Sequence, residues 1–103
     1  MKVVSNTTPI ISLATIGQVA LFKQLFGTIH IPHAVYAELK TKQAPGHSEI
    51  DASYFQQRTI QGTLYVGLLD HDLDRGETEA IVLAKELNAD TLIMDERTGY
   101  LIA

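Results

Sequence analysis

The 103-residue sequence contains no cysteine and no long apolar run. Without cysteine, a disulfide framework and a thiolate metal site are both excluded. A membrane-spanning helix needs ~20 consecutive apolar residues, and no segment approaches that length. The N-terminus becomes polar at Ser5 and Asn6, which is too early for a signal peptide. With no export signal, the expected compartment is the cytoplasm.

Positive charge is also scarce in this chain. Lysine and arginine total 8 against 12 aspartates and glutamates, which gives a net charge of −4. This balance excludes a protein that binds nucleic acid through bulk positive charge. Hydrophobic residues make up 46% and charged residues 19%, a mixture typical of one small globular domain. Any contact with nucleic acid therefore has to depend on something other than net charge.

Apolar strand-like runs alternate with helix-like stretches, which predicts an α/β fold with a parallel sheet covered on both faces. Strands are expected at 3–4, 28–31, 63–69 and 91–94, and helices at 9–16, 19–26, 34–42, 48–61, 74–87 and 96–103. The first helix is expected to have Thr8 as its N-cap and Pro9 as its first residue. The chain stops at Ala103 inside the last expected helix, so we expect a domain that is incomplete or completed by a partner.

In such sheets the ligand crevice lies beyond the carboxyl ends of the strands, so residues that follow a strand are the first candidates for a site. Asn6 follows the first expected strand and Asp95 follows the last. An alternative role for Asp95 is the N-cap of the helix that it precedes, and an alternative for Asn6 is a cap or an Asx-turn before Pro9. At this point the sequence leaves both roles open.

Glu77 is a further candidate because of its position on the helix expected at 74–87. At about 100° per residue, its side chain falls within the apolar sector of that helix, whereas Glu79 falls at the outer edge. A carboxylate on the core side needs a partner, since burying an unpaired charge is costly. The alternative is a capping box, in which Glu77 bonds to the backbone at Asp74.

Glu38 presents the same question on the helix expected at 34–42. It falls on the apolar side of that helix, and its alternative is an i,i+4 ion pair with Lys42, worth only ~0.3–0.5 kcal/mol. If the sheet is wound as expected, Asn6, Glu38, Glu77 and Asp95 meet at one end of it. Oxygen ligands without cysteine suit Mg²⁺ or Mn²⁺, and a divalent ion lets an acidic protein hold a polyanion.

Three segments carry a resemblance to a known family. They are VVSNTTPIISLATIG at 3–17, IHIPHAVYAEL at 29–39 and LDRGETEAIVLAKELNADTLIMDERTGYLIA at 73–103. Their order and spacing resemble a PIN domain of the PilT N-terminus-like branch, near the VapC-type toxins, across essentially the whole chain. The resemblance implies a single PIN-like domain over 1–103, with a three-layer α/β/α sandwich whose final helix and edge strand are expected to be missing.

The resemblance also implies an activity and a site. PIN domains are metal-dependent nucleases, usually ribonucleases, so RNA is the implied substrate and Mg²⁺ or Mn²⁺ the implied cofactor. The family acids fall at Asn6, Glu38, Glu77 and Asp95, with Glu38, Glu77 and Asp95 as catalytic carboxylates. Glu79 and Glu96 are reserve ligands, and Thr7 matches a supporting hydroxyl position. Relatives are often toxins held by a small antitoxin, and they tend to form homodimers.

One departure from the family pattern concerns charge. The usual first aspartate is Asn6 here, which keeps a carbonyl ligand but loses a full negative charge, so divalent binding should be weaker. The leading hypothesis is therefore a ribonuclease in which basic side chains contact backbone phosphates. The candidates for these contacts are Lys2, Lys40, Lys42 and Arg97.

Two other classes of function compete with the nuclease. The first is a catalytically weakened or inactive PIN scaffold that acts as a protein-binding module, for which the polar helix expected at 48–61 offers a partner or dimer surface. The second is a nucleotide-binding α/β module. The segment after the first strand, SNTTP at 5–9, is not the glycine-rich phosphate loop that such a module requires.

Overall fold

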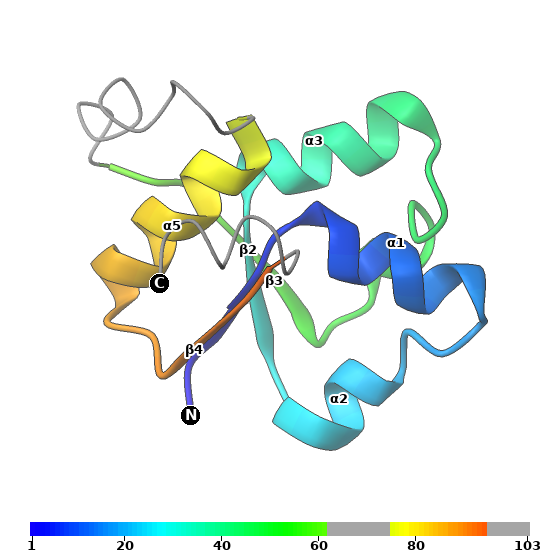
Figure 1. Ribbon diagram of the computed structural model, residues 1–103, viewed down its shortest axis with the longest axis horizontal. Helices are drawn as coiled ribbons and strands as arrows, with labels where there is room; N and C mark the ends of the chain where they lie inside the picture. Colours follow the sequence, from blue (N-terminus) through cyan, green and yellow to red (C-terminus); the bar gives the residue numbers. More distant parts are fainter. Residues whose placement is uncertain (62–74, 95–103) are drawn as a thin grey trace.

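Four short parallel strands form one sheet in the computed structural model, which describes residues 1–61 and 75–94 (Figure 1). They are β1 (Val3–Ser5), β2 (Ile29–Pro32), β3 (Phe55–Arg58) and β4 (Thr91–Ile93). The strand order is β3-β2-β1-β4, and every pairing is parallel. The prediction of a parallel sheet is confirmed, and β1 and β2 are its central strands.

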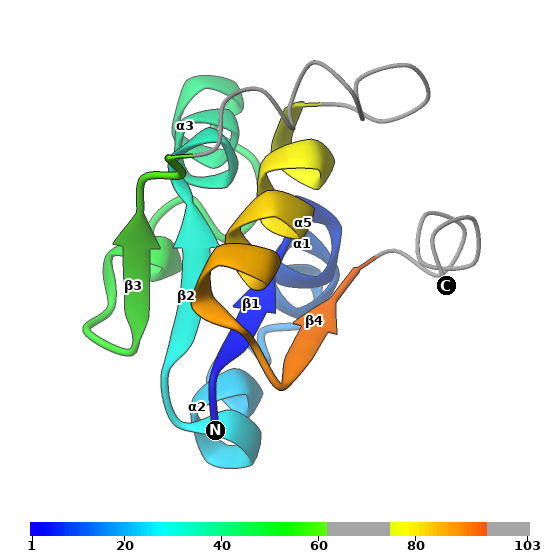
Figure 2. The same cartoon turned by 90° about the vertical axis from the view of Figure 1, so that its left-hand side faces the viewer.

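Helices cover both faces of this sheet, as expected for a three-layer sandwich. The helices α1 (Thr7–Thr15) and α2 (Leu21–Phe26) lie on one face, and α5 (Arg75–Leu87) lies on the other (Figure 2). The helix α3 (His33–Lys42) lies at the carboxyl end of the sheet and contacts both α1 and α5. The carboxyl ends of β1 and β2 therefore open into a region bounded by helices from both layers.

The central strand β1 supplies one residue to each of two hydrophobic cores. Val3 packs with Ile10 of α1 and Phe22 of α2, whereas Val4 packs with Leu83 of α5. Both valines are fully buried. Successive side chains of a strand point to opposite faces, so a strand covered on both faces has to be apolar throughout. This alternation fixes α1 and α5 on opposite sides of β1.

The helix expected at 48–61 is not formed, and that prediction is wrong. The segment contains a single 3-10 turn, η1 (Glu49–Asp51), and then β3, which pairs with β2. Only Phe55 of this strand is buried, and its ring packs edge-on against Phe22 with centroids 5.9 Å apart. The exposed residues that follow are polar, so the sequence shows no apolar alternation. Backbone pairing with β2 decides the structure here instead.

Two helix starts also differ from the prediction. α1 begins at Thr7 with Asn6 in the N-cap position, so Pro9 is the third helical residue. Proline is tolerated there because the first-turn N–H groups have no partner within the helix. α2 begins at Leu21, two residues later than expected. The strand expected at 63–69 and the helix expected at 96–103 lie outside the described residues.

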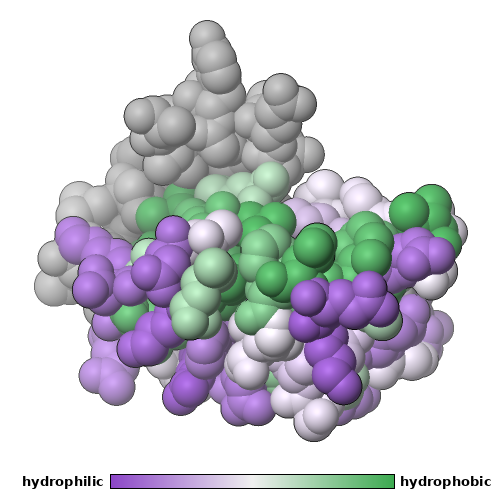
Figure 3. Space-filling view, turned by 90° about the horizontal axis from the view of Figure 1, so that it is seen from below, coloured by the Kyte–Doolittle hydropathy of each residue, from purple (hydrophilic) through white to green (hydrophobic). Residues whose placement is uncertain are grey.

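An apolar groove lies on the α1 and α2 side of the molecule (Figure 3). Its volume is about 350 Å³, and it is lined by Pro9, Ser12, Leu13, Leu21, Phe22, Leu25, Phe26 and Ile93. Leu25 is 68% exposed there. Within residues 1–61 and 75–94, no helix is long and apolar enough to cross a membrane.

Candidate functional site

Asn6 lies where the central strand ends and α1 begins. Its backbone N–H donates to the carbonyl of Ile93 at 3.1 Å, which extends the pairing of β1 with β4. It is 1% exposed, yet neither Oδ1 nor Nδ2 has a hydrogen-bond partner within residues 1–61 and 75–94. Asn6 occupies the N-cap position of α1, but its side chain makes no capping bond. Capping therefore does not account for this asparagine.

Thr7 repeats the pattern at the next position. Its side chain is buried, and its Oγ1 has no hydrogen-bond partner in the part of the chain that the structure describes. Leaving a buried polar group unsatisfied costs about 1–3 kcal/mol, so such groups are rare in native proteins. Two adjacent residues with unpaired polar atoms at the carboxyl end of the central strand are the pattern expected of a site that binds a polar ligand.

Glu38 comes to this place from α3. Its Oε2 lies 3.9 Å from Nζ of Lys42, so the expected i,i+4 ion pair is present but long. Its Oε1 lies 3.4 Å from the position that a Cβ on Gly76 would occupy, and Oγ1 of Thr7 lies 3.3 Å from the same position. Oε1 of Glu38 and Oγ1 of Thr7 therefore both lie against Gly76.

Gly76 brings α5 into this cluster. It is buried in the first turn of α5, and a side chain there would meet Thr7, Glu38 and Val35 at contact distance. The missing Cβ lets the helix approach the start of α1 and the middle of α3 closely. Gly76 was not predicted as a functional residue. The available signal was a glycine inside a strong helical pattern, where alanine is more favourable by ~1 kcal/mol.

Glu77 follows Gly76 in the first turn of α5 and is half-buried. The neighbouring Thr78, Glu79 and Ala80 are buried more deeply. The prediction that Glu79 lies at the outer edge of the buried face is therefore wrong. The prediction used helical projection alone, which does not include the partners that let this carboxylate be buried.

Glu79 has a partner for each carboxylate oxygen. Its Oε1 accepts a hydrogen bond from the backbone N–H of Ala34 at 3.2 Å, and its Oε2 accepts one from Nε of Arg75 at 2.8 Å. Ala34 is the second residue of α3, whose N-cap is Pro32 and has no capping side chain. Glu79 therefore acts as the side-chain cap of α3 and holds that helix against α5.

Asp95 and Glu96, the remaining predicted ligands, lie outside the described residues, as does Arg97. Asp95 follows β4 by two positions, and the last residue of β4, Ile93, pairs with Ser5. Within the described part of the chain, no group of three or more histidine, aspartate or glutamate side chains lies close enough to hold a metal ion. The predicted ligand set differs from such a group because it contains the amide of Asn6 and includes Asp95.

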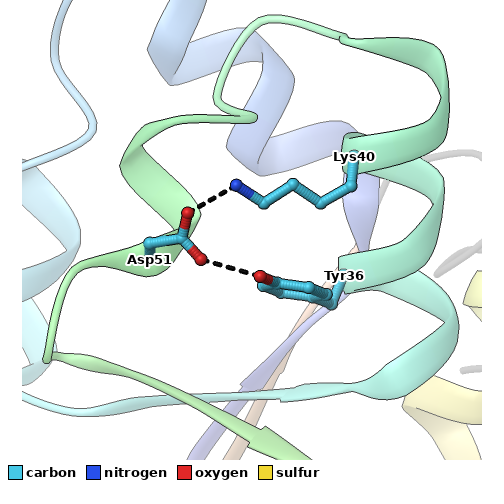
Figure 4. A network of polar contacts seen from close by, with 3 residues as sticks. All are labelled: Tyr36, Lys40 and Asp51. Carbon is cyan, nitrogen blue, oxygen red and sulfur yellow. Dashed lines mark hydrogen bonds and ion pairs between the residues drawn. The ribbon is translucent and has the colours of Figure 1, made fainter.

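Lys40, one of the cations expected to contact phosphate, is held by a carboxylate (Figure 4). Its Nζ pairs with Oδ2 of Asp51, whose Oδ1 accepts a hydrogen bond from the hydroxyl of Tyr36 at 2.8 Å. These two hydrogen bonds hold the pKa of Asp51 below its usual value. These contacts link α3 to η1. The charge of Lys40 is paired with Asp51, so it is less suited to contact a phosphate.

Comparison with known proteins gives one family. A family model of the PIN domain matches residues 2–103. No curated protein and no solved structure matches the chain. PIN domains are commonly nucleases and generally use divalent metal ions, so the match indicates a nuclease fold at the coarse level.

Proposed function

The chain belongs to the PIN-domain family, and on this premise we propose that it is a divalent-metal-dependent ribonuclease that hydrolyses RNA phosphodiester bonds. One observation carries the proposal. The side chains of Asn6 and Thr7 are buried at the carboxyl end of β1, and their polar atoms have no hydrogen-bond partner among the residues that the structure describes. A protein that only had to fold gains nothing from this arrangement, whereas a ligand there satisfies both residues.

The donor atoms fit Mg²⁺ or Mn²⁺. Asn6 offers an amide oxygen, Glu38 and Glu77 offer carboxylates, and the family resemblance adds Asp95. Hard divalent cations prefer such oxygen ligands. When bound, such an ion activates water and neutralises the charge that develops on the phosphate. Thr7 supplies a hydroxyl that both donates and accepts, which suits it to hold a ligand of the site in place.

The residues around the site have distinct roles in this proposal. Glu77 lies half-buried beside the site, where its carboxylate orients the attacking water and accepts its proton. Glu38 lies with Thr7 beside Gly76, where it offers a carboxylate to the ion. Asn6 contributes no charge, so the site holds a divalent ion less tightly than one with aspartate there.

The proposal is tested by calorimetric titration of Mn²⁺ into the parent chain, Glu38→Gln and Glu49→Gln. Glu49→Gln is a matched control, because it makes the same substitution at an exposed residue of η1. We expect saturable binding by the parent and the control, loss of binding in Glu38→Gln, and cleavage of single-stranded RNA that EDTA abolishes. No binding by the folded parent would contradict the proposal and favour the inactive, protein-binding scaffold.

The finer points of the family resemblance stay predictions. They are a toxin role, a small antitoxin as partner and a homodimer. Asp95 also stays a predicted ligand, and Asp95→Asn is expected to abolish metal-dependent cleavage while the protein remains folded. Full activity in that variant would remove Asp95 from the site.

A further inference from the structure

Arg75 is the first residue of α5 and directly precedes Gly76. Its side chain is 62% exposed, whereas that of Glu79, its partner one turn later, is 10% exposed. Nε of Arg75 donates to Oε2 of Glu79 at 2.8 Å. Because Glu79 is itself held by the N–H of Ala34, the carboxylate that binds Arg75 has a fixed position.

This pairing leaves the outer part of the guanidinium available. Arginine carries five N–H donors, and the hydrogen bond to Glu79 uses the one on Nε. The four donors on the terminal nitrogens form the planar fork that binds phosphate oxygens in pairs. In the described part of the chain, Arg75 has no ion pair apart from the one with Glu79.

Four other cations of the described residues are less suited to binding a phosphate at this end of the sheet. Nζ of Lys40 is paired with Asp51. Arg58 also donates through Nε, to Nδ1 of His30, but it lies on the edge strand β3, which β2 separates from β1 and therefore from Asn6 and Thr7. Lys2 precedes β1 and therefore lies at the amino end of the sheet. The side chain of Lys42 is 70% exposed, and its Nζ lies 3.9 Å from Oε2 of Glu38, a long ion pair that orients it weakly.

We propose that Arg75 binds a phosphate of the RNA strand next to the scissile bond, with Glu79 as the residue that orients its guanidinium. The proposal rests on the ribonuclease function proposed above and adds a substrate-binding residue to it. Arg75 directly precedes Gly76, and a Cβ on Gly76 would lie 3.3 Å from Oγ1 of Thr7 and 3.4 Å from Oε1 of Glu38, so the start of α5 lies beside these two residues. A contact between Arg75 and a phosphate also explains how an acidic chain binds a polyanion, because one local, oriented cation makes the contact.

The test measures RNA affinity against salt concentration. Fluorescence anisotropy follows binding of a fluorescein-labelled, single-stranded 20-nucleotide RNA in Ca²⁺, which takes oxygen ligands and replaces Mn²⁺ here to limit cleavage, and a gel checks that the RNA stays intact. The proteins are the parent, Arg75→Gln, Arg75→Lys and Lys23→Gln. Lys23→Gln is the matched control, since it removes one positive charge from the exposed face of α2, away from the carboxyl end of the sheet.

Each phosphate contact contributes about 0.7 to the slope of log affinity against log salt for single strands. We expect Arg75→Gln to lower the magnitude of this slope by about 0.7. Arg75→Lys should keep the slope and lose affinity, because lysine retains the charge without the fork. Lys23→Gln should match the parent.

A slope in Arg75→Gln equal to those of the parent and Lys23→Gln would overturn the role of Arg75 and leave the ribonuclease proposal standing. Equal affinities for the parent and Arg75→Lys would contradict the claim that the guanidinium fork, held by Glu79, contributes to phosphate binding. A folded parent that binds no RNA would overturn both proposals.

Discussion

The carboxylate of Glu79 accepts a hydrogen bond from the backbone N–H of Ala34, 45 residues earlier in the chain. α5 thereby supplies the cap that α3 lacks at its own start. The contact fixes the spacing between the helix that carries Glu38 and the helix that carries Gly76 and Glu77. A buried glutamate that looks like a metal ligand in the sequence therefore has a structural role with both of its oxygens.

Replacing Glu79 by alanine tests this role. We expect Glu79→Ala to lower the free energy of unfolding by roughly 2–3 kcal/mol, because it removes a helix cap and a charged hydrogen-bond acceptor. Arg75→Ala should cost less than about 1 kcal/mol, since the arginine is mostly exposed. Urea unfolding at pH 7 measures both variants. Equal losses would mean that the ion pair, and not the cap of α3, is what Glu79 contributes.

Gly76→Ala tests how closely the helices must approach at the site. The added Cβ would lie 3.3 Å from Oγ1 of Thr7 and 3.4 Å from Oε1 of Glu38, so these side chains have to move by a few tenths of an ångström. We expect Mn²⁺ affinity to fall roughly 10-fold, as when residues that support a metal ligand are changed. Thermal stability should change little, because alanine is more favourable than glycine in a helix by ~1 kcal/mol, which offsets the strain of the added Cβ. Calorimetry that gives the parent's affinity would contradict this.

The sequence predicted the parts of the fold that depend on apolar periodicity. Val3 and Val4 indicated a strand buried on both faces, and the helix expected at 74–87 is present as Arg75–Leu87. Prediction from the sequence was wrong where pairing between distant parts of the chain decides the structure. β3 has one buried residue, Phe55, and its exposed polar side chains resemble those of a surface helix.

Part of the candidate site could be predicted from the positions of residues that follow a strand. Asn6 and Thr7 were candidates because residues that follow a central strand reach the crevice, and both are buried with polar atoms that have no hydrogen-bond partner among the described residues. The roles of Gly76 and Glu79 were not predicted, because they depend on contacts between α5 and residues far away in the chain. Helical projection alone cannot identify the partner that lets a carboxylate be buried.

His30 makes the stability of the protein depend on pH. It is buried on β2, its Nδ1 accepts a hydrogen bond from Nε of Arg58 at 3.2 Å, and burial together with the charges of Arg58 and Lys2 lowers its pKa below 6.5. The unfolded chain therefore binds more protons than the folded chain in this range. The contribution of His30 to stability is fully present above pH 6.5 and is lost as the pH falls through the lowered pKa of the folded state.

We expect His30→Gln to reduce the fall in the free energy of unfolding between pH 7.5 and pH 5. Urea denaturation at each pH measures it, and His47→Gln on the turn after α3 is the control. The control should keep the pH dependence of the parent. The same pH dependence in His30→Gln as in the parent would show that this histidine is not the group responsible.

Thr7 and Thr78 offer a matched pair that separates binding from folding. Each side chain is buried, and its Oγ1 has no hydrogen-bond partner within the described ranges 1–61 and 75–94. Thr78 lies two residues after Gly76 on α5, which places it about 200° around the helix from the glycine that contacts Thr7. Valine has nearly the same shape as threonine without the hydroxyl, so both substitutions remove the same unsatisfied group.

We expect Thr7→Val and Thr78→Val each to raise the free energy of unfolding of the metal-free protein by about 1 kcal/mol, since a buried hydroxyl without a partner is costly. Only Thr7→Val should weaken Mn²⁺ binding, by roughly 10-fold. Urea denaturation and calorimetry on the same preparations measure the two effects. If both variants gain stability and only Thr7→Val loses Mn²⁺ binding, the hydroxyl of Thr7 is kept for a ligand at the expense of stability. If both variants bind Mn²⁺ like the parent, Thr7 has no part in a metal site.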